Sequence, residues 1–143
     1  MFWRWNVFLI SVCFCAYIIE CTPKKEDPVQ IVKKYHLECI DETKADPGIV
    51  ARIKKGDWKI PKAKLQQIKE WCLCVMMKAG LMTKQGVYKI DVALSQVPSE
   101  DKGSVENLID TCLSKKAIPA PDIAMMFIKC YQKARGNYTV TVL

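Results

Sequence analysis

Cysteine is the residue type with the most chemistry to offer in this sequence. The chain has eight cysteines, and five of them follow the first 21 residues: Cys39, Cys72, Cys74, Cys112 and Cys130. Thiolates bind metals, attack substrates or join as disulfides, and an oxidising compartment favours disulfides. Because an odd number leaves one thiol over, the first question is which of Cys72 and Cys74 is bonded.

Other chemistry lacks the partners it would need. His36 is the only histidine, so a Ser-His-Asp set cannot be built with confidence, and a zinc site needs several N or S ligands close together. Cys72 and His36 could form a nucleophile and its base, but a thiol on a packed helix face is usually inert. We expect His36 to be a surface or half-buried residue. We expect no catalytic site, no metal and no cofactor.

Residues 1–21 have the pattern of a secretory signal peptide. Arg4 is the only charged residue among the first 19, and the apolar run 7–19 is too short to span a bilayer. The alternative is an N-terminal anchor helix. Cleavage after Cys21 would leave residues 22–143, a length that suits one domain with one core, secreted into extracellular fluid.

The net charge of +7 does not by itself indicate nucleic-acid binding. Lysine pairs at 24–25, 33–34, 54–55 and 115–116 are scattered among apolar positions. A nucleic-acid interface would need a basic stripe with aromatic residues between the charges. We therefore expect no nucleic-acid partner and interpret the lysines as a solvated surface, with weak attraction to anionic surfaces as the alternative.

Helical spacing of apolar residues predicts six short helices and little strand. The helices are expected to begin at Pro28, Ile49, Pro61, Ile90, Val105 after a Ser104 cap, and Pro121, and to be ended by Pro47, Gly56, Gly80, Pro98, the sequence IPAP at 118–121, and Gly136. The tail 137–143 alternates and is β-prone. Helices this short are unstable alone in water, so they must share a core and cross-links in an all-α bundle.

The third of these helices contains both neighbouring cysteines. Residues two apart on a helix point about 200° apart. Cys72 falls on the apolar stripe and is expected to be buried, whereas Cys74 lies nearly opposite and faces another element. The run 71–77 is wholly apolar, which predicts that this helix is covered on more than one side.

The third helix has a distinctive spacing: Cys74 lies six residues before Gly80, which begins the sequence GLM, and Glu70 lies four residues before Cys74. The sequence GDW precedes this helix at 56–58. These segments resemble the insect odorant-binding proteins, also called pheromone-binding or general odorant-binding proteins, which have Gly-Asp-Phe before the third helix and a third-helix pattern of Cys-x-x-x-Cys, then Lys, then Gly-Leu-Met or similar. Cys74 corresponds to the second cysteine of that pair, and Glu70 stands where the first would be. The resemblance covers about residues 33–131.

The sixth helix resembles the same family. The family reads Cys-Asp-x-Ala…Lys-Cys-Tyr, and this chain reads PDIAMMFIKCY at 121–131, with Pro121 in place of the first cysteine. The two absent cysteines bond each other in the family. The resemblance therefore implies a four-cysteine, "C-minus" member with disulfides Cys39–Cys74 and Cys112–Cys130, and it leaves Cys72 as the free thiol.

The family encloses an apolar cavity that binds small, largely apolar molecules, and its C-terminal segment often helps to close the cavity. The ligand contacts expected from this resemblance are Trp58, Met76, Tyr88, Val92, Leu108, Ile123, Phe127, Tyr131, Val140 and Leu143. Asn137-Tyr138-Thr139 is also a glycosylation sequon. A glycan on Asn137 would hinder entry of the tail into a cavity, so these two interpretations compete.

The resemblance implies a secreted carrier of small hydrophobic molecules in sensillum lymph or another secretion. A membrane chemoreceptor is a further candidate partner, and the expected state is a monomer or weak homodimer. The alternative is a secreted helical protein on the same scaffold that acts by protein contact, such as a venom or immune-modulating factor, because a fold does not determine function.

Overall fold

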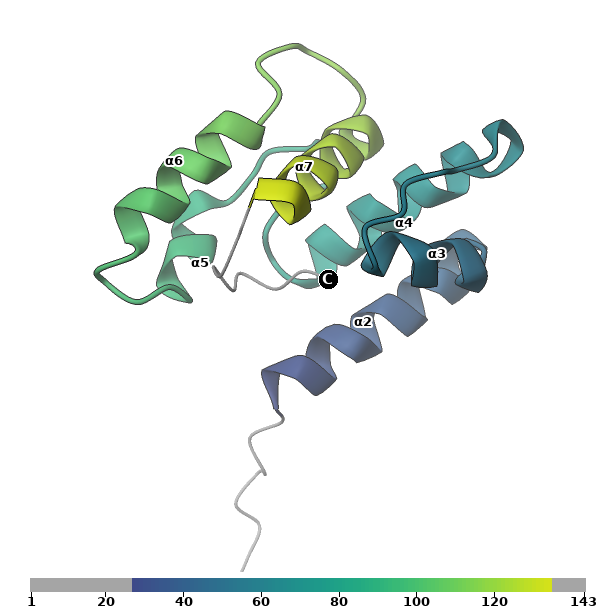
Figure 1. Cartoon of the computed structure of the whole chain (residues 1–143), viewed down its shortest axis with the longest axis horizontal. Helices are drawn as coiled ribbons and strands as arrows, with labels where there is room; N and C mark the ends of the chain where they lie inside the picture. The colour runs from purple at the N-terminus through teal and green to yellow at the C-terminus, as the bar shows by residue number, and fades with distance from the viewer. Residues whose placement is uncertain (1–26, 135–143) are drawn as a thin grey trace, which may run out of the picture.

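A computed structural model of the chain describes residues 27–134, and within this range it contains six α-helices and no strand (Figure 1). The helices are α2 (Pro28–Thr43), α3 (Pro47–Lys54), α4 (Leu65–Lys78), α5 (Ile90–Ser95), α6 (Lys102–Cys112) and α7 (Ala120–Ala134), and a 3-10 turn, η2 (Lys62–Lys64), precedes α4. The prediction of an all-α bundle is confirmed. The expected signal peptide and the tail with Asn137, Val140 and Leu143 lie outside the described residues.

Two Asp-Pro pairs begin the first two helices. Asp27 accepts a hydrogen bond from the Val29 amide (3.0 Å), and Asp46 accepts hydrogen bonds from the amides of Gly48 (2.8 Å) and Ile49 (3.1 Å). The second helix is present as predicted, but it begins at Pro47 rather than at Ile49, and the first helix ends at Thr43, before the Pro47-Gly48 break that was expected to end it. An aspartate N-cap followed by proline starts a helix, because proline has no amide hydrogen to lose there.

Three other boundaries differ from the prediction by a few residues. The third helix starts with the 3-10 turn η2 before it becomes α-helical. The Val105 amide already donates to the Asp101 carbonyl (3.0 Å), so α6 begins at Lys102 rather than after Ser104. The fourth helix ends at Ser95 rather than just before Pro98.

Helix α4 is the centre of the bundle. It packs against both α2 and α7, and α7 also packs against α6, as Figure 1 shows. The side chains of Ile68, Trp71, Cys72, Val75 and Met76 on α4 are fully buried. The predicted cover on more than one side is confirmed.

Two disulfides tie the outer helices to the centre. Cys39–Cys74 joins α2 to α4 with the Cα atoms 5.8 Å apart, and Cys112–Cys130 joins α6 to α7 with the Cα atoms 5.5 Å apart. These are the pairings that the family resemblance implied. One turn beyond Cys74, the Lys78 ammonium contacts carboxylate oxygens of Glu38 (2.9 Å) and Glu42 (2.8 Å). These ion pairs join the same two helices, α2 and α4, as the Cys39–Cys74 disulfide.

An ion pair joins α4 to α7 beside the positions of the two absent family cysteines. Lys69 Nζ lies 2.6 Å from Asp122 Oδ1, and both side chains are partly buried. Each partner is next in sequence to a vacant position, because Glu70 and Pro121 stand where the resemblance places cysteines. Lys69 and Asp122 therefore connect α4 to α7 at the point where the family has a covalent link.

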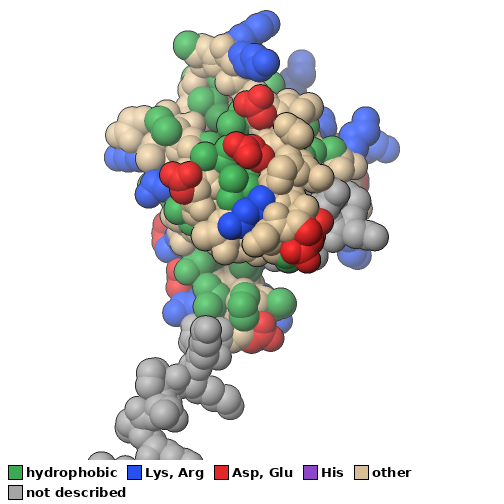
Figure 2. All heavy atoms as spheres, turned by 90° about the vertical axis from the view of Figure 1, so that its left-hand side faces the viewer, with side chains coloured by type: hydrophobic (Ala, Val, Ile, Leu, Met, Phe, Trp, Pro, Cys, Tyr) green, Lys and Arg blue, Asp and Glu red, His purple; other side chains and the backbone are tan. Residues whose placement is uncertain are grey.

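The surface over α5 and α6 has no concentration of one charge. Acidic, basic and apolar side chains are interspersed over this face (Figure 2). This is the pattern of a solvated surface.

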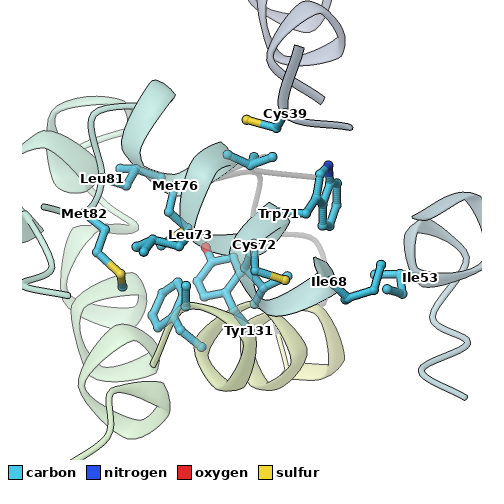
Figure 3. Packing of buried hydrophobic residues seen from close by; sticks show 14 of the residues in the cluster. Cys39, Ile53, Ile68, Trp71, Cys72, Leu73, Met76, Leu81, Met82 and Tyr131 are labelled. Carbon is cyan, nitrogen blue, oxygen red and sulfur yellow. The ribbon is translucent and has the colours of Figure 1, made fainter. Parts of the chain in front are cut away.

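Cys72 is the free thiol, and it is fully buried. Figure 3 shows it in the cluster of buried side chains that also contains Ile68, Trp71 and Tyr131. Burial raises the pKa of the Cys72 thiol far above its ordinary value, because the charged thiolate is poorly solvated there. Cys72 is therefore a packing residue.

His36 lies in the core, which corrects the expectation of a surface or half-buried residue. Only 2% of it is exposed. Its ring meets Trp71 edge-on, with ring centroids 5.5 Å apart, and the Trp71 indole donates to the His36 carbonyl (3.4 Å). The sequence does not reveal this, since the pairing crosses from α2 to α4.

We predict that Cys72 in the native protein reacts very slowly with iodoacetamide, even at mildly alkaline pH. The raised pKa keeps the group as the unreactive thiol, and burial excludes the reagent. Mass spectrometry should find no alkylated cysteine in the folded protein. It should find one after the protein is denatured without reduction of its disulfides. Rapid labelling of the folded protein would contradict the buried position.

We predict that Glu70→Cys combined with Pro121→Cys forms a third disulfide and stabilises the fold. Closing this loop contributes up to about 4 kcal/mol in the chain-entropy model. The loss of proline from the first turn of α7 and of the Gln66–Glu70 hydrogen bond (2.8 Å) offsets part of this. The melting temperature should rise for the double variant and for neither single variant. If oxidation forms no new bond, the two positions are not neighbours.

Candidate functional site

Three aromatic rings form a row along the inner face of α7. The Phe127 ring centroid lies 4.6 Å from that of Tyr88 and 5.6 Å from that of Tyr131. Phe127 and Tyr131 are four residues apart, so α7 presents them on one face. The structure thus brings together three of the residues predicted to contact ligand, and we call Tyr88, Phe127 and Tyr131 the aromatic row.

A tight turn after α4 delivers Tyr88 to α7. The Thr83 amide donates to the Val87 carbonyl (2.9 Å), and the Lys89 amide donates to the Leu81 carbonyl (2.8 Å). Met82 and Tyr88 form an isolated antiparallel bridge. The sequence TKQG at 83–86 predicted this turn, but not that its far side would meet α7.

Gly86 allows the turn to approach α7 closely. Its φ is +86°, a conformation that favours glycine. A Cβ atom at this position would lie 2.9 Å from Ile123 Cδ1 and 3.1 Å from the Ala120 Cα atom. Gly86 is therefore a positioning residue for Tyr88, and the resemblance to the family did not single it out.

The aromatic row carries no charge at physiological pH. Burial, followed by the nearby Tyr131, raises the pKa of the Tyr88 phenol well above its ordinary value, because a phenolate would be poorly solvated there. The row therefore offers a neutral ring surface, which suits contact with an apolar molecule.

The other residues predicted to contact ligand lie in different surroundings. Met76 is fully buried, while Leu108 and Ile123 are partly buried against the core. Val92 lies at the surface of α5 with 36% of it exposed. Leu81 and Met82, which sequence reasoning missed, are also buried, next to the turn that carries Tyr88.

Trp58 lines a cleft of its own rather than extending the aromatic row. Its indole Nε1 donates to Gln132 Oε1 (2.7 Å), and Gln132 Nε2 donates to the Ile53 carbonyl (2.9 Å). The cleft has a volume of about 470 Å³. No local pattern could have indicated Gln132, because it lies 74 residues from Trp58.

Within residues 27–134, no helix is long and apolar enough to cross a membrane.

The sequence of this helical bundle matches a known family. The PBP/GOBP family model matches residues 22–134, which is most of the chain. This protein belongs to the PBP/GOBP family. The family resemblance inferred from the cysteine spacing is confirmed.

Two curated relatives are similar over most of this family member. General odorant-binding protein 69a of Drosophila melanogaster is 23% identical over 110 residues, which are 77% of this chain and 72% of the relative. The B2 protein of Tenebrio molitor is 26% identical over 117 residues, which are 79% of this chain and 86% of the relative.

Two solved structures share the fold. The fatty acid binding protein OBP56a from the oral disk of the blowfly Phormia regina superposes with a TM-score of 0.60 at 21% identity, covering 80% of this chain and 98% of that one. The medfly odorant-binding protein CcapOBP22/CcapOBP69a superposes with a TM-score of 0.56 at 27% identity, covering 71% and 85%.

The PBP/GOBP family consists of carrier proteins rather than enzymes. This member is accordingly a carrier of small ligands and not an enzyme. Its membership of the C-minus subclass remains a prediction from the cysteine count.

We predict that Gly86→Ala destabilises this PBP/GOBP protein by about 1–3 kcal/mol, because it combines backbone strain with a clash against α7. Gly103→Ala is the matched control: no atom lies within 4 Å of a Cβ built there, and alanine favours a helix. Urea denaturation should separate the two variants, with the control at or slightly above the wild type. Equal stabilities would contradict the close approach.

Proposed function

We propose that this protein is a secreted carrier that holds a small hydrophobic molecule in an internal apolar cavity bordered by the aromatic row. The observation that carries the proposal is the row itself, with ring centroids 4.6 and 5.6 Å apart along α7. Ring faces contribute a large contact area and adapt to apolar ligands of different shape.

The surroundings of the row support an apolar ligand. Met76 and Met82 are buried in the same core, and methionine is a flexible residue that adapts to varied apolar partners. The phenol of Tyr88 stays neutral and can donate a hydrogen bond to the ligand or accept one from it. An uncharged molecule with a long apolar body and at most one or two polar groups fits this environment best.

The names of the relatives agree with a largely apolar ligand. One solved structure is described as a fatty acid binding protein, and a second solved structure and a curated relative are described as odorant-binding proteins. We propose odorants, pheromones or similar apolar molecules for this chain. The alternative of a protein-contact factor, such as a venom or immune-modulating protein, gains no support from these relatives.

The remaining parts of the proposal follow from the family. The protein would solubilise its ligand in extracellular fluid, either sensillum lymph or another secretion, and deliver it to a membrane chemoreceptor. We expect a monomer or weak homodimer. The tail, with Val140 and Leu143, is proposed to contribute to closure of the cavity if Asn137 carries no glycan.

We predict that Phe127→Ala weakens binding of a neutral naphthylamine dye by roughly five- to thirtyfold, since the central ring of the row is worth about 1–2 kcal/mol in contacts. Met126→Ala is the control, because Met126 is the preceding residue on α7 and is 49% exposed. Fluorescence titration should show near-native affinity for the control. Phe127→Leu, which keeps more of the core volume, tests whether a loss reflects the ring or the fold.

The carrier proposal would be overturned by absence of saturable dye binding to the wild type. Placement of the site at the row would be overturned by near-native affinity in a folded Phe127→Ala variant.

A further inference from the structure

The cleft beside Trp58 is lined by positive charge. Four of its lining residues are lysines: Lys54 and Lys55 from the end of α3, and Lys129 and Lys133 from α7. Gly56, Trp58 and Gln132 complete the lining, and no acidic residue contributes to it. At about 470 Å³, the cleft falls within the usual size range of small-molecule sites.

No acidic partner within the described part of the chain neutralises these lysines. The ion pairs between residues 27 and 134 involve other basic residues: Lys34, Arg52, Lys69 and Lys78. Asp57 is the acidic residue nearest in sequence, but it faces Arg52 (3.6 Å) and accepts from the Lys59 amide (3.0 Å). The positive charge of the cleft is therefore available to a ligand.

The lysines at the end of α3 are not needed as hydrogen-bond donors to its last carbonyl groups. Lysine often lies at a helix C-terminus because it stabilises the free carbonyl groups there. Here Gln132 Nε2 already donates to the carbonyls of Ile53 (2.9 Å) and Lys54 (3.3 Å). Partial burial and then the nearby Lys33 lower the pKa of Lys54, so its charge is less favourable in the cleft than in water.

The cleft differs in charge from the face over α5 and α6, which mixes acidic, basic and apolar side chains (Figure 2). A cleft lined by one sign of charge attracts the opposite sign more strongly than scattered charges do. The half-buried Trp58 adds an aromatic surface to the wall.

We propose that this cleft is a second, surface binding site for a small organic oxyanion, such as a carboxylate with a short apolar chain. The lysine ammonium groups would bind the oxyanion with charge-assisted hydrogen bonds, and the apolar part would lie against Trp58. The site is distinct from the aromatic row and does not depend on the proposed carrier function.

The indole N–H of Trp58 is the reporter for a test by NMR on the disulfide-bonded protein. Its signal, assigned with Trp58→Phe, should respond to a ligand because the group donates to Gln132 in the cleft wall. We expect a saturable shift with octanoate and none with octanol. Because sodium chloride screens charge, added salt should weaken the octanoate effect.

Two triple variants with the same net charge locate the site. Lys54→Gln, Lys129→Gln and Lys133→Gln together should weaken octanoate binding by about tenfold or more, since each exposed charge contributes a modest increment. Lys62→Gln, Lys64→Gln and Lys84→Gln are the matched control, at exposed positions outside the cleft. If the first triple does not fold, Lys133→Gln against Lys84→Gln makes the same comparison, with a smaller expected difference.

The proposal would be overturned if octanol and octanoate shifted the Trp58 indole signal equally, or if the two triple variants bound octanoate with equal affinity. It would also be overturned if the protein bound phosphatidylserine vesicles but not free octanoate, since the cleft would then be specific for a lipid surface. Binding of the neutral naphthylamine dye should be unchanged in the cleft variant, so failure of this site and failure of the carrier proposal give different results.

Discussion

The burial of α4 between α2 and α7 is the constraint on which the rest of the structure depends. Four of the five positions from 71 to 75 on this helix are buried: Trp71, Cys72, Leu73 and Val75. These side chains point to more than one side of the helix, and one partner helix could cover only one side. On the α2 side the contact is secured by the Cys39–Cys74 disulfide. On the α7 side the contact is secured by the Lys69–Asp122 ion pair, and truncating either partner would leave a partly buried charge without its counter-ion.

The position of α7 follows from several independent attachments. Asp122 is held near its first turn, Cys130 is bonded to α6, and Gln132 is hydrogen-bonded to the end of α3. A helix restrained along its whole length can present side chains at reproducible positions. The aromatic row and the cleft beside Trp58 both rely on this restraint.

The two faces of α7 carry opposite chemistry. Phe127 and Tyr131 are buried, whereas Lys129 and Lys133 are exposed. Residues two apart on a helix point about 200° apart, so the two pairs alternate along the same turns. The inner pair is suited to a neutral apolar molecule and the outer pair to an anion. One amphipathic helix therefore borders both the aromatic row and the cleft beside Trp58.

The sequence by itself determined the six helices, the opposite roles of Cys72 and Cys74, and the family, because helical spacing and cysteine spacing are local properties. The family resemblance also identified the residues of the aromatic row, but not their stacking. Only the tertiary structure decided how Tyr88 reaches α7, that His36 is buried against Trp71, that Lys69 meets Asp122, and that Trp58 faces Gln132 in a basic cleft. These contacts join residues 35 or more apart, and such pairs leave no periodic pattern in one sequence, since their meeting depends on how whole helices pack.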